Sequence, residues 1–172
     1  MKYGTWLRSL VFEYIYTKYQ SGPYNHDRTE NISDHIAGMD DYYNHSIYTG
    51  WQHWGQVIGN PLYRSPIYNT DNSIDVRNNR FYALHLGVEG SPTERLDYRV
   101  LTTYQKGWGT YNNPFTKAYK NLSFLVEAKY KFNHNWTVRG GYAMDFGSEK
   151  MYGHNAGFQL TVTKSGLLTK KK

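Results

Sequence analysis

The sequence of 172 residues contains no cysteine. Disulfide bonds, thiolate metal sites and cysteine nucleophiles are therefore excluded. It also lacks any unbroken apolar run of about 20 residues, the length that a helix needs to cross a bilayer. The mean hydropathy of −0.77 agrees with this. Membrane strands remain compatible with such a sequence, because only alternate residues of a strand face lipid.

Two further signals are missing. The net charge of +6 is scattered instead of forming a basic stripe, and no nucleic-acid-binding module is recognisable, so nucleic acid is not an expected partner. The N-terminal residues lack the long apolar core and cleavage site of a secretory leader. Because the strands described next are typical of a secreted bacterial protein, we expect this chain to be the C-terminal part of a longer one.

The chain is rich in aromatic residues, which make up 17% of it and include 18 tyrosines. From Tyr82 to Val162, even-numbered positions are mostly apolar and odd-numbered ones are mostly polar or small. Such alternation predicts strands with one apolar and one polar face. The clearest case is 121–132, where the even positions are Leu122, Phe124, Val126, Ala128, Tyr130 and Phe132.

The pattern predicts a first strand near Thr5–Tyr19, for which a helix starting at Trp6 is the alternative, and then five more strands. These are Asn79–Glu89, Leu96–Lys106, Asn121–Phe132, Trp136–Phe146 and Ala156–Ser165. Short turns at 90–93 and 133–135 alternate with longer connections at 20–73, 107–120 and 147–155. Short turns at one end and long loops at the other are typical of outer-membrane barrels. A short helix near Gly50–Val57 is one option within the longest connection.

The predicted fold is all-β: a portion of an antiparallel transmembrane β-barrel, with about six or seven up-and-down strands. Residues 1–172 form a single unit, and residues 20–73 form one long irregular extracellular loop or a plug. Outward aromatic residues gather near the two ends of the strands, as bilayer interfaces favour. They are Trp6, Tyr98, Phe132 and Trp136 at the short-turn end, and Tyr14, Tyr16, Tyr104, Phe146 and Phe158 at the long-loop end. The alternative is a soluble β-sandwich, in which the same alternation would pack a core.

The inward, odd-numbered face carries charges of both signs. Such charges are costly away from water unless they are paired, so we expect structural ion pairs across the lumen. A conduction path for charged solutes is the alternative. The residues predicted to form the ion pairs are Glu13, Arg99, Glu127, Lys129, Arg139 and Asp145.

The loops mix aromatic rings with neutral hydrogen-bonding groups, a combination suited to stacking on sugar rings and bonding their hydroxyls. The predicted polysaccharide-binding residues are Tyr48, Trp51, His53, Trp54, Trp108 and Tyr111. The loop histidines and aspartates have irregular spacing, so no metal, cofactor or catalytic residue is predicted. They leave open a barrel enzyme that acts on lipid or peptide through His26, His35, His45 or His53 and nearby Asp27, Asp34, Asp40 or Asp41.

Two segments, Phe12–Pro23 and Tyr42–Leu62, resemble the Wzi family of capsule assembly proteins, and the strand-rich remainder fits the C-terminal part of that family. The resemblance implies an outer-membrane barrel of a Gram-negative bacterium that attaches capsular polysaccharide as a lectin and not as an enzyme. Implied partners are capsular or surface polysaccharide, outer-membrane lipid and the missing N-terminal strands of the parent barrel. A porin or transport barrel for small polar solutes is the alternative.

The sequence departs from that family in lacking the leader and the N-terminal strands. It also ends at Gly166–Lys172 without a terminal aromatic residue, which is the usual insertion signal of such barrels. A few strands of a large barrel cannot close alone and would leave two unpaired edges. Insertion of the chain by itself is therefore in doubt.

Overall fold

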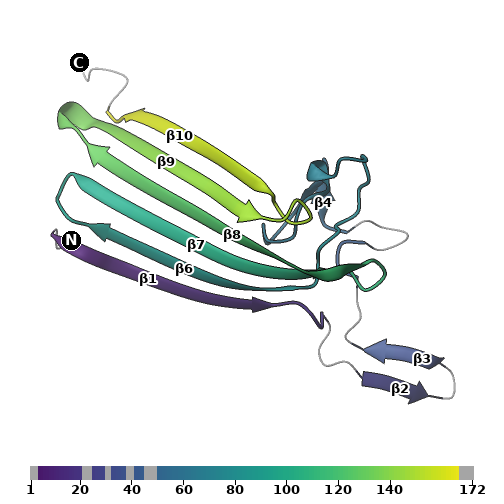
Figure 1. Cartoon of the computed structure of the whole chain (residues 1–172). Helices are drawn as coiled ribbons and strands as arrows, with labels where there is room; N and C mark the ends of the chain where they lie inside the picture. The colour runs from purple at the N-terminus through teal and green to yellow at the C-terminus, as the bar shows by residue number, and fades with distance from the viewer. Residues whose placement is uncertain (1–3, 21–24, 30–31, 38–40, 45–49, 167–172) are drawn as a thin grey trace.

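The computed structural model describes residues 4–20, 25–29, 32–37, 41–44 and 50–166. Six strands form one antiparallel sheet (Figure 1). They lie side by side in the order in which they occur in the chain, and a long connection joins the first strand to the second. In order across the sheet they are β1 (Thr5–Tyr16), β6 (Phe81–Ser91), β7 (Leu96–Gly109), β8 (Pro114–Lys131), β9 (Trp136–Gly147) and β10 (His154–Lys164). The predicted all-β antiparallel fold is confirmed.

The described part of the chain contains no α-helix, so the helix considered at Trp6 is wrong and β1 takes its place. None of the described segments forms a helix with the length and apolarity required to cross a bilayer. The 3₁₀ turns η1 (Pro66–Tyr68) and η2 (Asn133–Asn135) are each three residues long. The second of them is the short connection that the sequence predicts after β8.

The long connection between β1 and β6 carries two small hairpins. One pairs β2 (Asn25–Thr29) with β3 (Ile32–Ala37), and the other pairs β4 (Gln52–His53) with β5 (Gln56–Val57). The helix considered near Gly50–Val57 is therefore wrong. Trp54 and Gly55 have φ values of 53° and 71°, and two consecutive positive φ angles are what a two-residue hairpin turn requires.

The strands extend further than the alternation predicts at the long-loop end. β7 has 14 residues and β8 has 18, so the medium loop expected at 107–120 is reduced to 110–113. A register irregularity between Gly107 and Gly109 interrupts the period of two at this point. That irregularity, with lysines at 117 and 120, hides the start of β8 from a search for alternating residues.

Apart from the end of β7 beyond Gly107, the register keeps even residues opposite even residues from β1 to β10. One row across the sheet runs Leu10, Val88, Val100, Val126, Tyr142 and Phe158. We call the side that carries these residues the even face, and the opposite side the odd face. In the described residues no second sheet covers the even face, and Phe12, Leu86 and Leu160 lie exposed on it. The packing expected of a β-sandwich is therefore absent there.

Aromatic side chains lie toward both ends of the even face, but they are not confined to the ends. Tyr14, Tyr104 and Phe146 share one row near the long loops. Phe158 lies two rows further from the loops, opposite Tyr142, so its predicted place at the long-loop end is wrong. The misplacement arises because the sequence gives each strand's direction but not its stagger against its neighbours.

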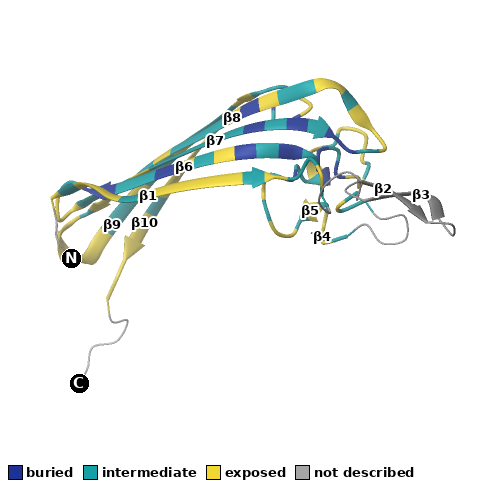
Figure 2. Ribbon diagram, turned by 90° about the horizontal axis from the view of Figure 1, so that it is seen from below, coloured by how far each residue is buried: buried dark blue, intermediate teal, exposed yellow. Residues whose placement is uncertain are grey.

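The buried core lies on the odd face, at the long-loop end of the sheet (Figure 2). Residues 41–44 and 50–79, which we call the plug segment, supply Tyr63 and Val76, and β6 supplies Phe81 and Ala83. The ring centroids of Tyr63 and Phe81 are 5.0 Å apart in an edge-to-face arrangement, which aromatic pairs favour. Among the residues of the predicted 20–73 connection that the structure describes, most belong to the plug segment and thus pack against the sheet.

Hydrogen bonds hold the plug segment together and fix it to the sheet. Asn44 bonds Val76 in both directions, donating to its carbonyl and accepting from its amide at 2.8 Å each. The Gln105 side chain donates to the Leu62 carbonyl at 2.8 Å, and the Tyr152 hydroxyl donates to that of Pro61 at 3.0 Å. Contacts with β7 and with the β9–β10 loop therefore hold this segment over the odd face.

Candidate functional site

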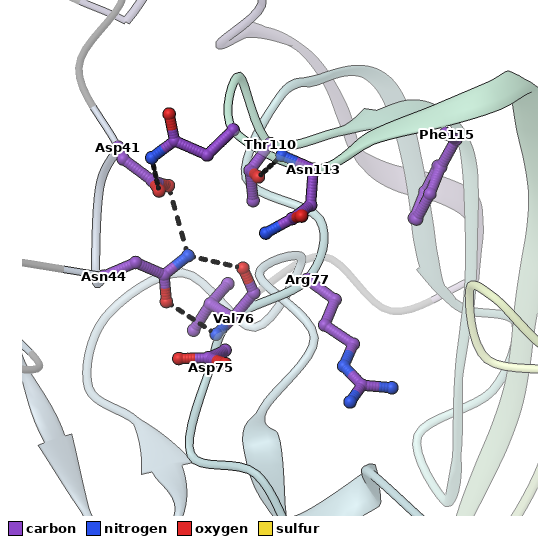
Figure 3. Close-up of a pocket in the computed structure, with 9 residues that line it drawn as sticks. Asp41, Asn44, Asp75, Val76, Arg77, Thr110, Asn113 and Phe115 are labelled. Atoms are coloured by element: carbon purple, nitrogen blue, oxygen red, sulfur yellow. Dashed lines mark hydrogen bonds between the residues drawn. The ribbon is translucent and has the colours of Figure 1, made fainter.

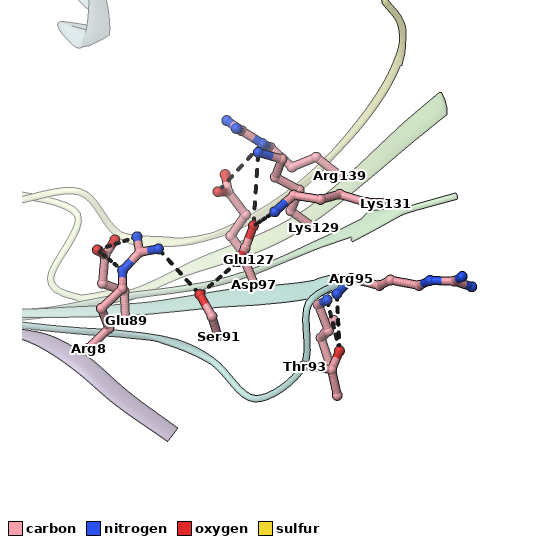
Figure 4. Close-up of polar contacts among 11 residues, drawn as sticks. Arg8, Glu89, Ser91, Thr93, Arg95, Asp97, Glu127, Lys129, Lys131 and Arg139 are labelled. Atoms are coloured by element: carbon pink, nitrogen blue, oxygen red, sulfur yellow. Dashed lines mark hydrogen bonds and ion pairs between the residues drawn. The ribbon is translucent and has the colours of Figure 1, made fainter. Parts of the chain in front are cut away.

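Toward the short turns, the odd face carries a network of charged side chains (Figure 4). Glu127 lies between two guanidinium groups, with O–N distances of 3.4 Å to Arg99 and 3.7 Å to Arg139. Asp97 accepts from Lys131 at 3.2 Å and lies 4.0 Å from Lys129. The structure therefore places four of the six residues predicted as lumen ion pairs in two neighbouring groups of ion pairs: Arg99, Glu127 and Arg139 in one, and Lys129 in the other.

Arg8 joins the Asp97 group through the Ser91 hydroxyl, which donates to Asp97 at 2.8 Å, although its neighbours at even positions of β1, Trp6 and Leu10, are apolar. Its guanidinium donates to Glu89 at 2.7 Å and to the Ser91 hydroxyl at 3.3 Å. A register irregularity between Thr5 and Ser9 explains the discrepancy, because it disrupts the alternation of β1 just before Ser9. The weak alternation of this strand is the one sequence signal that could have indicated the irregularity.

The other two residues predicted as lumen ion pairs make no ion pair with the described residues. Glu13 lies opposite His85 in the register and lines a cavity of about 310 Å³ beside the plug segment. Asp145 accepts hydrogen bonds from the hydroxyl of Ser123 and the amide of Asn121 instead of binding a cation. Both residues lie nearer the long loops, where polar neighbours and the plug segment surround them.

One polar cavity opens between the plug segment and the β7–β8 loop (Figure 3). Its volume is about 550 Å³, and Asp41, Asn44, Arg77, Thr110 and Asn113 are among its lining residues. Asp41 accepts hydrogen bonds from the side-chain amides of Asn44 and Asn79 in the plug segment and of Asn112 in the β7–β8 loop. Most of the lining groups thus already serve to hold the loops together.

A larger cavity, of about 780 Å³, lies between the plug segment and the odd face of β7, β8 and β9. Burial lowers the pKa of the Arg64 guanidinium, whose nitrogens donate to the Asn69 side chain and the Tyr68 carbonyl. Burial also raises the pKa of the Tyr152 hydroxyl. The remaining lining is mostly uncharged and hydrogen-bonding, and it includes Gln56, Ser65, Thr103, Ser123 and Asn155. This cavity has the size and polarity that suit a sugar residue.

Three of the predicted polysaccharide-binding residues lie together on the β4–β5 hairpin. Trp51 and Trp54 are 70% and 85% exposed, and the His53 ring lies 6.2 Å from that of Trp54. The next strand, β5, contributes Gln56 and Val57 to the larger cavity. The hairpin therefore presents two open indole rings beside a polar cavity. Tyr48 lies outside the described residues.

The remaining two, Trp108 and Tyr111, lie at the end of β7 and in the loop after it, among cations. The Lys18 ammonium is 5.1 Å from the centre of the Trp108 ring, and the Lys106 ammonium is 5.4 Å from it. The Arg80 guanidinium stacks on Tyr111 at 3.9 Å. The structure thus divides the predicted polysaccharide-binding residues into two groups with different chemistry.

The histidines and aspartates considered for catalysis are not assembled in the described residues. His53 lies exposed on its hairpin, and Asp41 is hydrogen-bonded to side-chain amides. His26, Asp27, Asp34 and His35 are placed only as positions on β2 and β3, while Asp40 and His45 lie outside the described residues. No group of three potential metal ligands occurs in the described part of the chain.

Comparison with known proteins gives no relative. No family model matches the chain, and neither the curated proteins nor the solved structures include a match.

Proposed function

We propose that this chain is part of the wall of an outer-membrane β-barrel that retains capsular or other surface polysaccharide without acting as an enzyme. The observation that carries the proposal is the opposite character of the two sheet faces. Along β7 the even residues from Leu96 to Tyr104 are Leu96, Tyr98, Val100, Thr102 and Tyr104, and none of them is charged. The matching even positions of the paired strands are free of Asp, Glu, Lys and Arg as well.

This uncharged band spans about 27 Å along the strands, at about 3.4 Å per residue. At the strand tilt of about 40° usual in barrels, this length gives a height of about 21 Å, somewhat below the apolar band of about 25 Å that outer-membrane proteins present to lipid. A soluble protein seldom leaves so wide an apolar face without a partner. The proposal also requires additional strands on β1 and β10, whose outer edges pair with no other described strand.

Polysaccharide binding is proposed for the loop end. Two open tryptophan rings can stack on the C–H faces of sugars, and the adjoining cavity offers neutral groups for sugar hydroxyls. The plug segment and the paired charges on the odd face both narrow any path along that face. They therefore favour a binding role over that of an open pore.

A binding measurement on the purified chain in detergent micelles tests this proposal. We expect wild-type protein to bind at least one member of a panel of purified bacterial capsular polysaccharides. The double substitution Trp51→Ala/Trp54→Ala should weaken binding about tenfold or more, since each ring stack contributes on the order of 1 kcal/mol. Trp136→Ala, which removes an exposed tryptophan at the opposite end of the sheet, is the control. Equal affinity for wild type and the double variant would reject these residues as the site.

A further inference from the structure

We infer that the cationic residues at the loop end of the even face bind the phosphate groups of an outer-leaflet glycolipid. The site, which we call the rim cluster, consists of Lys18, Arg80, Lys106, Trp108 and Tyr111. This inference rests on the proposed function, because it needs the even face to lie against lipid. It assigns a second ligand to two residues that the sequence alone associates with polysaccharide.

The first support is the absence of counter-ions. On the odd face, Arg8, Arg99, Lys131 and Arg139 each lie within 4.0 Å of a carboxylate. In the rim cluster, the three cations make no ion pair with any residue that the structure describes. Each of these cations instead lies over an aromatic ring, which attracts a positive charge without neutralising it.

The second support is a pair of like charges placed opposite each other. Lys106 and Lys120 are partners in the β7–β8 register, so both side chains stand on the even face of adjacent strands. Like charges in directly opposed positions destabilise a sheet. An anion bound between them would remove that repulsion, whereas no described acidic residue of this chain does so.

The third support is the arrangement of Arg80. Its guanidinium stacks on Tyr111 at 3.9 Å, and Nη1 donates to the Thr110 carbonyl at 3.3 Å. The buried Nε has no hydrogen-bond partner in the described residues. The Arg80 guanidinium is thus fixed in place while one of its N–H donors has no hydrogen-bond acceptor in the described residues. Arginine in this condition is suited to phosphate, which accepts several charge-assisted bonds.

The position of the cluster selects an amphiphilic ligand over a free anion. Lys106 follows directly on the uncharged band, one row beyond Tyr104. The rings of Tyr104, Tyr82 and Trp108 form a chain, with centroids 6.0 Å and 5.9 Å apart. A lipid whose acyl chains cover the band would place its headgroup on these rings and its phosphates on the lysines. Cations at the edge of an apolar face bind anionic lipid surfaces in this way.

The test compares lipid binding by the full chain reconstituted into phosphatidylcholine vesicles. The vesicles carry either a bis-phosphorylated diglucosamine glycolipid or the same lipid after removal of its phosphates, and retention is read by flotation and native mass spectrometry. We expect retention of the phosphorylated lipid alone. Lys18→Gln/Lys106→Gln should weaken it roughly 10- to 30-fold, the scale expected for two cations at an anionic membrane surface.

Two matched variants keep the result interpretable. Lys18→Arg/Lys106→Arg preserves both charges and should retain the lipid. Arg95→Gln/Lys150→Gln removes two exposed cations from connections outside the rim cluster and should also retain it. Millimolar inorganic phosphate should not displace the lipid, and displacement would overturn the glycolipid assignment in favour of a free-phosphate site.

The remaining outcomes separate this inference from the function on which it rests. Equal retention of the phosphorylated and dephosphorylated lipids, or an unaffected glutamine variant, overturns the inference while vesicle insertion of the chain still supports a lipid-facing sheet. Loss of acidic polysaccharide binding in the glutamine variant, with lipid retention unchanged, assigns the cluster to polysaccharide and overturns it too.

Discussion

The two faces of the six-stranded sheet treat charge in opposite ways. On the odd face, acidic and basic side chains from neighbouring strands lie close enough to compensate each other, as Glu127 does between Arg99 and Arg139. On the even face, the central rows exclude charge altogether, and the cations beyond them at the loop end have no acidic partner in the described residues. The charges of the odd face are thus compensated within the chain, whereas the cations of the even face have no compensating acid among the described residues.

The largest effect is expected from placing a charge at the centre of the even face. Leu86→Arg should destabilise the membrane-inserted chain by about 2–4 kcal/mol, the cost of a cation at the bilayer midplane. The matched control is Leu125→Arg. Leu125 lies on the odd face, at nearly the same height along the strands as Leu86, and the substitution should be tolerated better there. Flotation with phosphatidylcholine vesicles and unfolding in urea measure the two effects. Similar losses in both variants would mean that the faces are not distinguished by lipid.

A smaller effect is expected from removing the shared acid of the odd face. Glu127→Gln leaves Arg99 and Arg139 without their carboxylate and should cost about 1–2 kcal/mol, less than for a fully buried pair. The reduction reflects the exposure of the two arginine side chains, at 44% and 47%. Denaturant unfolding measures the change. Glu94→Gln, at an exposed turn residue without an ion pair to any described group, should have no effect.

An effect that is absent at neutral pH and appears only in alkaline solution concerns the junction between the plug segment and the odd face. Burial raises the pKa of Tyr63 from 10.0 to about 12, so the folded state favours the neutral phenol. Its contribution to stability is complete below pH 10 and is lost as the pH rises from about 10 to about 12. Tyr63→Phe has no proton to lose there. The stability difference between wild type and this variant should therefore change across that interval, and a constant difference would contradict the raised pKa.

Much of the sheet was predictable because the alternation of apolar and polar residues is a local property of the sequence. Alternation alone places β6, β7, β9 and β10 within two or three residues of their observed ends. It fails at irregularities of the register, which is why the even position of Arg8 does not reveal its face and why the first residues of β8 were predicted as a loop. A single inserted residue reverses every later assignment in a strand, and composition gives no warning of it.

The site was less predictable because its contacts are distant in the sequence. The sequence treats the aromatic residues of the loops as one group, and nothing local shows that Lys18 and Arg80 approach Trp108 and Tyr111. The packing of Tyr63 on Phe81 is hidden in the same way, since the plug segment has no periodicity to reveal which side chains turn inward. Contacts of this kind follow from the fold as a whole.

The long connection between β1 and β6 also has a consequence for the order of folding. Pairing these strands closes a loop of roughly 60 residues, which costs about 2 kcal/mol more in chain entropy than the four-residue turn between β8 and β9. The bonds of Asn44 with Val76 and of Thr17 with Phe81 draw the two ends of that loop together. β1 is therefore expected to join the sheet late, once the plug segment has folded and shortened the distance that the chain must close.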